Sequence, residues 1–170
     1  ANGDRVKYSY DSLGRVIKET YFEDNERDVP SRVIRYSYDS SGAVARVTDS
    51  ATGIETVCWY DYAGRVAVLA ETDNRTFYRE VVNTYDANGN VTNVEETLKE
   101  FGYNVGIIVV EEAIYGYEYV YDYKNRLASV RTNDTIKDYH YDELDRLVSE
   151  AVSDKDGQNV LYTRYRYHSA

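Results

Sequence analysis

The sequence predicts an all-β protein, an antiparallel meander of stacked β-hairpins that curls into an open spiral or a partial barrel. A nine-residue phrase, YSYDSLGRV at 8–16, returns as YSYDSSGAV at 36–44 and recurs in weaker form further along. Side chains of two kinds alternate at the start of this segment, as they do in a β-strand. Turn residues follow, and a second alternating run comes after them. Tyrosine, which favours strands, supplies 20 of the 170 residues, and the chain holds one proline.

A Tyr-Asp pair marks the first strand and the turn of each hairpin. Aspartate is favoured at the first position of a type I turn, and a one-residue bulge after that turn requires left-handed backbone at the fourth position. The pairs begin at Tyr10, Tyr38, Tyr60, Tyr85, Tyr121 and Tyr141, and the fourth positions hold Gly14, Gly42, Gly64, Gly89, Asn125 and Asp145. Glycine, asparagine and aspartate all tolerate that conformation. Six turns of this type are therefore predicted, and YRYH at 165–168 begins a seventh copy.

The second strand of each hairpin follows from the bulge. The bulge predicts that Tyr10 faces Val16 and that Tyr8 faces Lys18, and in every copy it pairs the motif tyrosine with a valine or a leucine. These pairs predict a buried stripe on one face of the sheet. Alanine and asparagine replace the motif arginine at positions 43 and 90. The Asp-Arg ion pair at the bulge is therefore interpreted as an accessory interaction of the turn.

Further turns separate the hairpins, at 49–53, 71–74, 132–134 and 154–157, with a longer connection around 23–30. Between Thr92 and Tyr117 the repeat spacing stretches. A long hairpin leading into GIIVVEEAIY is predicted there, and the alternative is a short helical face formed by Val94, Leu98 and Phe101. Residues 1–170 are interpreted as one array of about six repeats, a fragment of a larger repeat protein.

The residues Tyr8, Tyr10, Asp11, Gly14, Arg15 and Val16 resemble the motif of the YD-repeat, or Rhs (rearrangement hotspot), family. The resemblance extends over nearly the whole chain and implies a spiral of β-hairpins. In that family the repeats form shells in bacterial polymorphic toxins, insecticidal toxin complexes, cell-wall-associated proteins and teneurins. The resemblance therefore implies an extracellular or cell-surface location. Six copies are too few to close a shell, so the chain resembles a section of wall.

The charge balance disfavours two classes of partner. The chain has 20 lysines and arginines against 30 aspartates and glutamates, a formal net charge of −10. Nucleic acids and anionic membrane surfaces are bound mainly through lysine and arginine, so neither is expected as a partner. No apolar run reaches the length of about 20 residues that a membrane-spanning helix needs.

The sequence offers little catalytic chemistry. His140 lies between two strand tyrosines, His168 replaces a motif aspartate, and Cys58 replaces a stripe tyrosine, so each is interpreted as a repeat substitution. The acidic turn at 154–159 resembles half of a calcium loop but has Tyr165 at the twelfth position, where a carboxylate is needed. We therefore expect no enzymatic activity, no cofactor and no metal.

Aromatic residues outside the stripe suggest an alternative role in recognition. Trp59, Tyr115 and Tyr117 are the candidate residues for stacking on glycans or for binding a cell-surface protein. The expected function is a non-enzymatic structural module that forms part of a shell wall or scaffold, with neighbouring repeats of the parent chain as its partners. A glycan-binding module and a hydrolase are the alternatives. Open strand edges also predict self-association.

Overall fold

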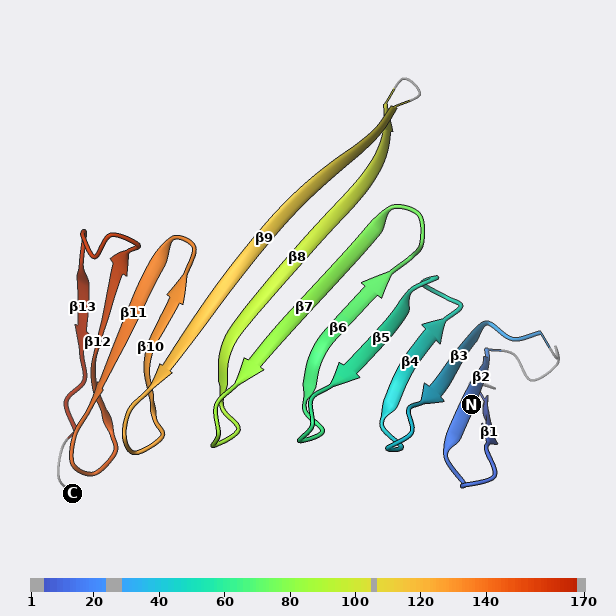
Figure 1. The fold of residues 1–170 in the computed structure, drawn as a ribbon, viewed down its shortest axis with the longest axis horizontal. Coiled ribbons are helices and arrows are strands. Elements are labelled where there is room, and N and C mark those ends of the chain that lie inside the picture. Colours follow the sequence, from blue (N-terminus) through green and yellow to red (C-terminus); the bar gives the residue numbers. More distant parts are fainter. Residues whose placement is uncertain (1–4, 24–28, 105–106, 168–170) are drawn as a thin grey trace. The chain divides into compact units, whose positions relative to one another are not determined.

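The computed structural model describes residues 5–23, 29–104 and 107–167, and the regular structure in these segments is entirely β (Figure 1). The strands are β1 (Arg5–Tyr10), β2 (Val16–Phe22), β3 (Arg32–Tyr38), β4 (Val44–Asp49), β5 (Glu55–Tyr60), β6 (Val66–Thr72), β7 (Phe77–Tyr85), β8 (Val91–Asn104), β9 (Ile107–Tyr121), β10 (Leu127–Thr132), β11 (Thr135–Tyr141), β12 (Leu147–Asp154) and β13 (Leu161–Arg164). Successive strands pair in chain order from β1 to β13 within one sheet. The predicted antiparallel meander is confirmed, and the sheet is not closed into a barrel.

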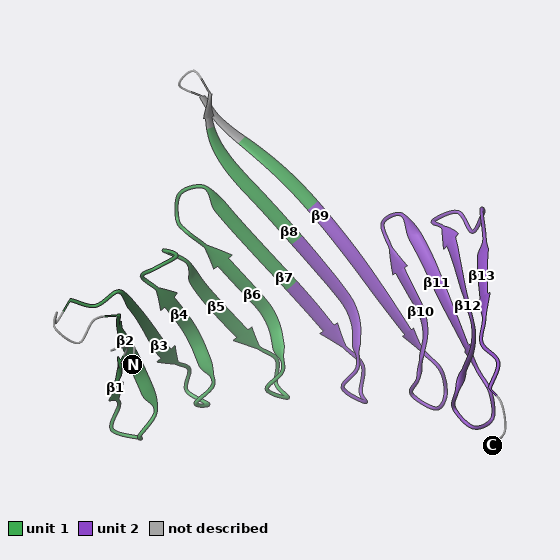
Figure 2. Ribbon diagram, turned by 180° about the vertical axis from the view of Figure 1, so that it is seen from behind, with its two compact units in different colours: residues 1–81, 97–113 green, residues 82–96, 114–170 purple. Residues whose placement is uncertain are grey.

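The chain divides into two compact units (Figure 2). The first contains residues 1–81 and 97–113, and the second contains residues 82–96 and 114–170. Strands β7, β8 and β9 contribute residues to both units. Among the described residues, no helix is long and apolar enough to cross a membrane.

The stretched region between Thr92 and Tyr117 is a long hairpin, as predicted, and the alternative helical face does not form. Strand β8 has 14 residues and β9 has 15, about twice the length of most other strands (Figure 1). Lys99 and Glu112 form an ion pair between them, with 3.1 Å between Nζ and Oε1. The longer connection predicted around 23–30 lies largely outside the described residues.

The motif turns adopt the predicted conformation in all six copies. The fourth turn position has a positive φ in every copy, for example +78° at Gly14 and +65° at Asn125. The carboxylate of Asp11 accepts hydrogen bonds from the backbone N–H groups of Leu13 and Arg15, each 2.9 Å long. Aspartate opens the phrase because its short side chain can accept both of these bonds.

The register contains a second irregularity that sequence reasoning missed. Tyr10 faces Val16 as predicted, but the next pair is Ser9 with Lys18, so Ile17 is an extra residue in the ladder. Tyr8 consequently faces Glu19, and the predicted pairing with Lys18 is wrong. Four further hairpins show the same shift directly before the motif tyrosine. A bulge of this kind increases local twist, so neighbouring hairpins diverge near their turns.

Burial is shallower than the predicted stripe implies. The buried apolar side chains among the described residues are Phe22, 6% exposed, and Ile34, 9% exposed. Most motif tyrosines are half-buried, but Tyr10 on the edge strand is 57% exposed and Tyr167 is 47% exposed. A single sheet has no second layer to cover its faces, so its side chains are shielded mainly by their neighbours within the sheet.

Candidate functional site

The contact between one hairpin and the next, here called a junction, repeats a side-chain arrangement. At the first junction the ladder between β2 and β3 ends at the pair Lys18 and Arg35. Two residues before Lys18, the backbone carbonyl of Val16 accepts a hydrogen bond from the hydroxyl of Tyr38, 2.6 Å away. The phenol thus replaces a ladder hydrogen bond beyond the point where the strands diverge.

Further motif tyrosines make the same bond, and the tyrosines that make it are here called the clasp tyrosines. Each donates its hydroxyl to the carbonyl of the valine or leucine that follows the previous motif turn, at distances of 2.6 to 3.0 Å. The donors and acceptors are Tyr38 and Val16, Tyr60 and Val44, Tyr121 and Val91, Tyr141 and Leu127, and Tyr167 and Leu147. The hydroxyl explains why the motif holds tyrosine, since phenylalanine has no donor.

The motif arginine also contacts the next hairpin. The guanidinium of Arg15 lies 4.2 Å from the ring centre of Tyr38, and Arg126 and Arg146 lie at similar distances over the next clasp tyrosines. Arg15 Nε also donates to Asp11 Oδ2 at 2.7 Å. The arginine therefore joins the turn of its own hairpin to the ring of the next one, through an ion pair and a cation–π contact. This arrangement is more than the accessory pairing that the sequence suggested.

The hydrogen bonds in the turns lower the pKa of the motif aspartates. For Asp11 the main cause is the bond from the backbone N–H of Arg15, and for Asp142 it is the bond from the N–H of Arg146. The pKa values of Asp39, Asp61, Asp86 and Asp122 are also lowered. These carboxylates are ionised throughout the neutral range.

This shift predicts acid sensitivity with a defined sign. A carboxyl group whose pKa is lower in the folded state stabilises the protein above its ordinary pKa of about 3.9, and the contribution is lost as the pH falls through the folded value. We expect the melting temperature to be nearly constant above about pH 5 and to fall below about pH 4. Thermal unfolding followed by circular dichroism measures this. The substitution Asp142→Asn should flatten the fall, and a melting temperature unchanged in strong acid would contradict the assignment.

Trp59, the first of the predicted stacking residues, lies on β5 beside a groove. Its side chain is 51% exposed and projects from the face opposite Tyr60, because neighbouring residues of a strand alternate. The groove has a volume of about 720 Å³ and is also lined by Asp39, Arg46 and Tyr62. Tyr62 is 99% exposed. The groove thus combines aromatic faces with charged groups.

Tyr115 and Tyr117 lie on β9, on the same face as the clasp tyrosine Tyr121. They line a smaller concavity of about 310 Å³ together with the turn that contains Asn133. Tyr115 is 44% exposed and Tyr117 is half-buried. Trp59 belongs to the first compact unit and this tyrosine pair to the second, so the two concavities are separate candidates.

The side chain of Asn133 supports the second concavity. Its Oδ1 accepts from the N–H of Gly116 at 3.0 Å, and its Nδ2 donates to the carbonyl of Ile114 at 2.8 Å. A Cβ atom on Gly116 would lie 3.1 Å from Asn133 Oδ1, so glycine permits this close approach. The amide thereby continues the β-ladder from the turn onto β9.

Asn133→Asp should lower the free energy of unfolding by about 1–2 kcal/mol, because it removes the donor and places a carboxylate against the Ile114 carbonyl. Urea unfolding measures the loss. Asn93 on β8 is exposed, and Asn93→Asp should change stability by less than about 0.5 kcal/mol. Equal losses in the two variants would mean that the amide bridge does not stabilise the turn.

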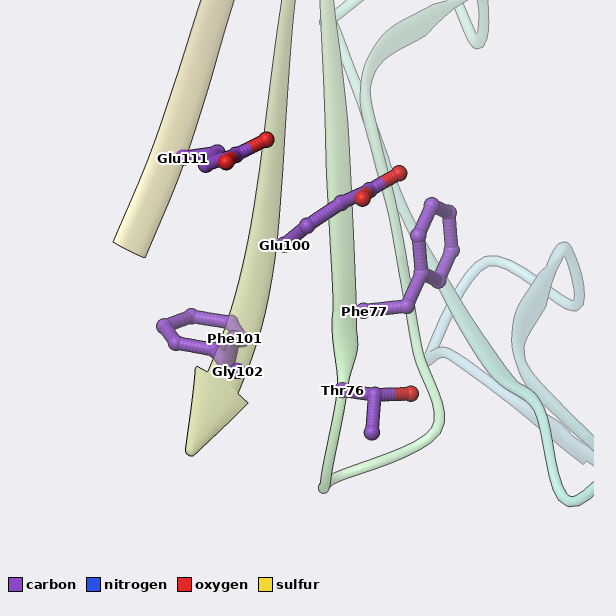
Figure 3. A pocket seen from close by; sticks show the side chains of 6 residues that line it. All are labelled: Thr76, Phe77, Glu100, Phe101, Gly102 and Glu111. Atoms are coloured by element: carbon purple, nitrogen blue, oxygen red, sulfur yellow. The ribbon is translucent and has the colours of Figure 1, made fainter. Parts of the chain in front are cut away.

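A third pocket, of about 440 Å³, lies between the ends of β7, β8 and β9 (Figure 3). Glu100 and Glu111 project to the side on which Phe77 lies, while Phe101 projects to the other side (Figure 3). Both carboxylates are exposed, and neither has a hydrogen-bond partner among the described residues. A hydrolase would require carboxylates of this kind to act as acid and base on a bound substrate.

The other sequence candidates have ordinary surroundings. His140 is exposed, and its Nδ1 lies 3.1 Å from the carbonyl oxygen of Tyr139. Burial raises the pKa of the Cys58 thiol. His168 lies outside the described residues. In the segments that the structure describes, no group of three or more His, Cys, Asp and Glu side chains could hold a metal ion.

Comparisons with known proteins assign no family to the chain. No protein-family model matches it. No curated protein matches it either. Among solved structures, TcdB2-TccC3-Cdc42 aligns with 96% of this chain and 12% of its own chain, at 17% identity and a TM-score of 0.46. TcdB2-TccC3 aligns with 95% and 12%, at 16% identity and a TM-score of 0.44. A protein of unknown function from Bacteroides fragilis aligns with 91% and 94%, at 10% identity and a TM-score of 0.22.

Proposed function

We propose that the chain is a non-enzymatic structural module, part of the wall of a shell or scaffold in a larger protein. The observation that carries this proposal is the use of the motif residues. Aspartate closes its own turn, arginine stacks on the next hairpin, and tyrosine bonds to the previous one. The repeated phrase thus serves to attach each hairpin to its neighbours, as expected of an array stabilised by nearest-neighbour contacts.

The YD-repeat resemblance of the motif extends the proposal to the parent protein. It favours an extracellular or cell-surface parent, with a toxin-related shell as one form. The immediate partners would be further repeats of the same chain, which would pair with the edge strands β1 and β13. A second copy of the chain could use the same edges.

Carbohydrate or cell-surface recognition is a second candidate function. It is favoured by the exposure of Trp59 at the rim of its groove, because flat aromatic faces stack on apolar sugar faces. The concavity at Tyr115 and Tyr117 would be an independent subsite.

A glycan array tests the two candidates against each other. The structural proposal predicts no selective glycan binding by the intact chain, by Trp59→Ala or by Tyr115→Ala. Selective, saturable binding that is lost in one of these variants would replace the structural proposal with recognition. Turnover of glycoside or ester substrates that is lost in Glu100→Gln or Glu111→Gln would instead favour the hydrolase.

A further inference from the structure

The junction between β4 and β5 lacks the arginine that the other complete motifs provide. Position 43, which corresponds to Arg15, Arg126 and Arg146, is an alanine. The clasp tyrosine of this junction, Tyr60, still donates its hydroxyl to Val44, at 2.8 Å. The tyrosine bond of this junction is therefore present, but position 43 supplies no guanidinium to it.

The junction between β10 and β11 shows what a guanidinium contacts at this place. Arg126 Nε donates to Asp122 Oδ2 at 2.7 Å, and the guanidinium carbon lies 4.5 Å from the ring centre of Tyr141. Its Nη1 donates to the Asp145 carboxylate in the next turn and, at 3.4 Å, to the backbone carbonyl of Asp142. Two carboxylates, an aromatic face and a carbonyl therefore surround the arginine head.

Three of these groups have counterparts at the junction that contains Ala43, namely Asp39, Tyr60 and Asp61, and all three line the groove of about 720 Å³ beside Trp59. Gly64 stands at the position of Asp145. Asp39 Oδ1 accepts from the backbone N–H groups of Ser41 and Ala43. Its other oxygen, Oδ2, which pairs with arginine in the complete motifs, has no hydrogen-bond partner among the described residues. The groove thus retains three of the groups that contact a motif guanidinium, and position 43 supplies no arginine to it.

The other substituted junction is closed by its own side chain. Asn90 Nδ2 donates to Asp86 Oδ2 at 2.9 Å, and it also donates to Asn125 Oδ1. The carboxylate oxygen that arginine would bind is therefore occupied there. Alanine at position 43 cannot make an equivalent bond, so the open carboxylate is specific to this junction among the described ones.

The charges around the groove favour a cation. Hydrogen bonding from Ser41 lowers the pKa of Asp39, so its carboxylate is ionised at neutral pH. Burial raises the pKa of Tyr60, and the negative charge of Asp39 adds to this shift, in keeping with a carboxylate close to the phenol. Arg46 also lines the groove, but it is ion-paired with Glu55. The net charge of the chain, −10, attracts basic partners.

We propose that this groove binds the guanidinium of an arginine side chain presented by a partner protein. The guanidinium pairs with Asp39 Oδ2 and stacks on the ring of Tyr60, as the chain's own arginines do at other junctions. Trp59 and Tyr62 flank the groove and provide apolar contact area for the residues beside that arginine. This site is additional to the structural role, because the clasp at Tyr60 is already complete.

Titration of the intact chain with an acetylated Leu-Arg-Leu peptide amide tests the proposal. Trp59 is the only tryptophan of the chain, so its indole signal in fluorescence and NMR reports on the groove directly. We expect a saturable change with the arginine peptide and binding about tenfold or more weaker with citrulline in its place, because citrulline keeps the shape but lacks the charge. Equal binding of the two peptides would overturn the proposal.

Variants locate the site. Ala43→Arg restores the motif arginine, so it should abolish peptide binding and raise the melting temperature. Asp39→Asn keeps the turn acceptor but removes the charge, and it should weaken binding about tenfold. Ala87→Arg adds the same charge at an exposed turn in the other unit and should bind as the unchanged chain does. Full binding by a folded Ala43→Arg variant would refute the site.

Free arginine separates two sources of the guanidinium. A peptide that binds more tightly than free arginine supports a partner protein, since Trp59 and Tyr62 would then contact the flanking residues. Tighter binding of free arginine would assign the groove to a small guanidinium compound and overturn the partner-protein part of the proposal.

Discussion

Replacing Gly64 by valine is expected to lower the free energy of unfolding by about 2 kcal/mol. Gly64 occupies the fourth position of an interior motif turn with φ of +77°, which a β-branched residue adopts only with strain. A Cβ atom at this position would meet nothing within 4 Å, so the cost arises from the backbone conformation and not from a clash. Urea unfolding measures the loss, and hydrogen exchange should show it first in β5 and β6.

Gly64→Asn is the matched control. Asn125 already occupies the equivalent position in another hairpin with φ of +65°, so asparagine should cost less than about 1 kcal/mol. Equal losses for the valine and asparagine variants would show that left-handed backbone is not what the turn requires.

Tyr38→Ala should have the largest effect, a loss of about 3 kcal/mol in the free energy of unfolding. The substitution removes the ring that supports the guanidinium of Arg15 together with the hydroxyl that bonds to Val16. Equilibrium unfolding of the variant in urea measures this loss.

Two phenylalanine variants separate the hydroxyl from the ring. Tyr38→Phe keeps the ring and should cost about 1 kcal/mol, the usual net contribution of one hydrogen bond. Tyr10 occupies the same motif position on the edge strand, where its hydroxyl has no partner among the described residues, so Tyr10→Phe should change stability by less than about 0.5 kcal/mol. Equal effects of the two phenylalanine variants would mean that the bond to Val16 contributes nothing.

The sequence predicted the parts of the fold that depend on residue type. Glycine, asparagine or aspartate at the fourth turn position identified the left-handed turns, and the motif tyrosine was correctly paired with the valine or leucine across the ladder. Both features follow from local backbone chemistry and from the two-residue period of a strand. The long hairpin at 91–121 followed from the same alternation.

The second bulge and the clasp could not be predicted in the same way. The extra residue, Ile17 in the first hairpin, belongs to no single residue type, since Ala45 and Ala67 occupy the same place in other hairpins. The partner of the clasp tyrosine is a backbone carbonyl, which every residue has, so no side chain in the sequence reveals it. The arginine of one motif and the tyrosine of the next were a usable signal, because they contact each other across the junction.

Depth of burial was overestimated for a related reason. The pattern of the motif distinguishes one face of the sheet from the other, but it does not say whether anything covers that face. Ile34 is buried, whereas Tyr8 and Tyr10 at the edge are more than half exposed. Of the predicted stacking residues, Trp59 and the pair Tyr115 and Tyr117 each line a concavity, and what either concavity binds stays a prediction.

The antiparallel order of the strands also has an evolutionary consequence. Motif turns and connecting turns alternate along the chain, because each hairpin is followed directly by the next. The repeated motif constrains the motif turns, while the connecting segments vary from the short turn after Thr132 to the long extension of β8 and β9. Insertions in the connecting segments, and duplications of whole hairpins, would leave the Tyr–carbonyl bonds intact. A gene of this kind can therefore lengthen by duplication of hairpins and diversify in its connecting segments, without changes to the contacts between hairpins.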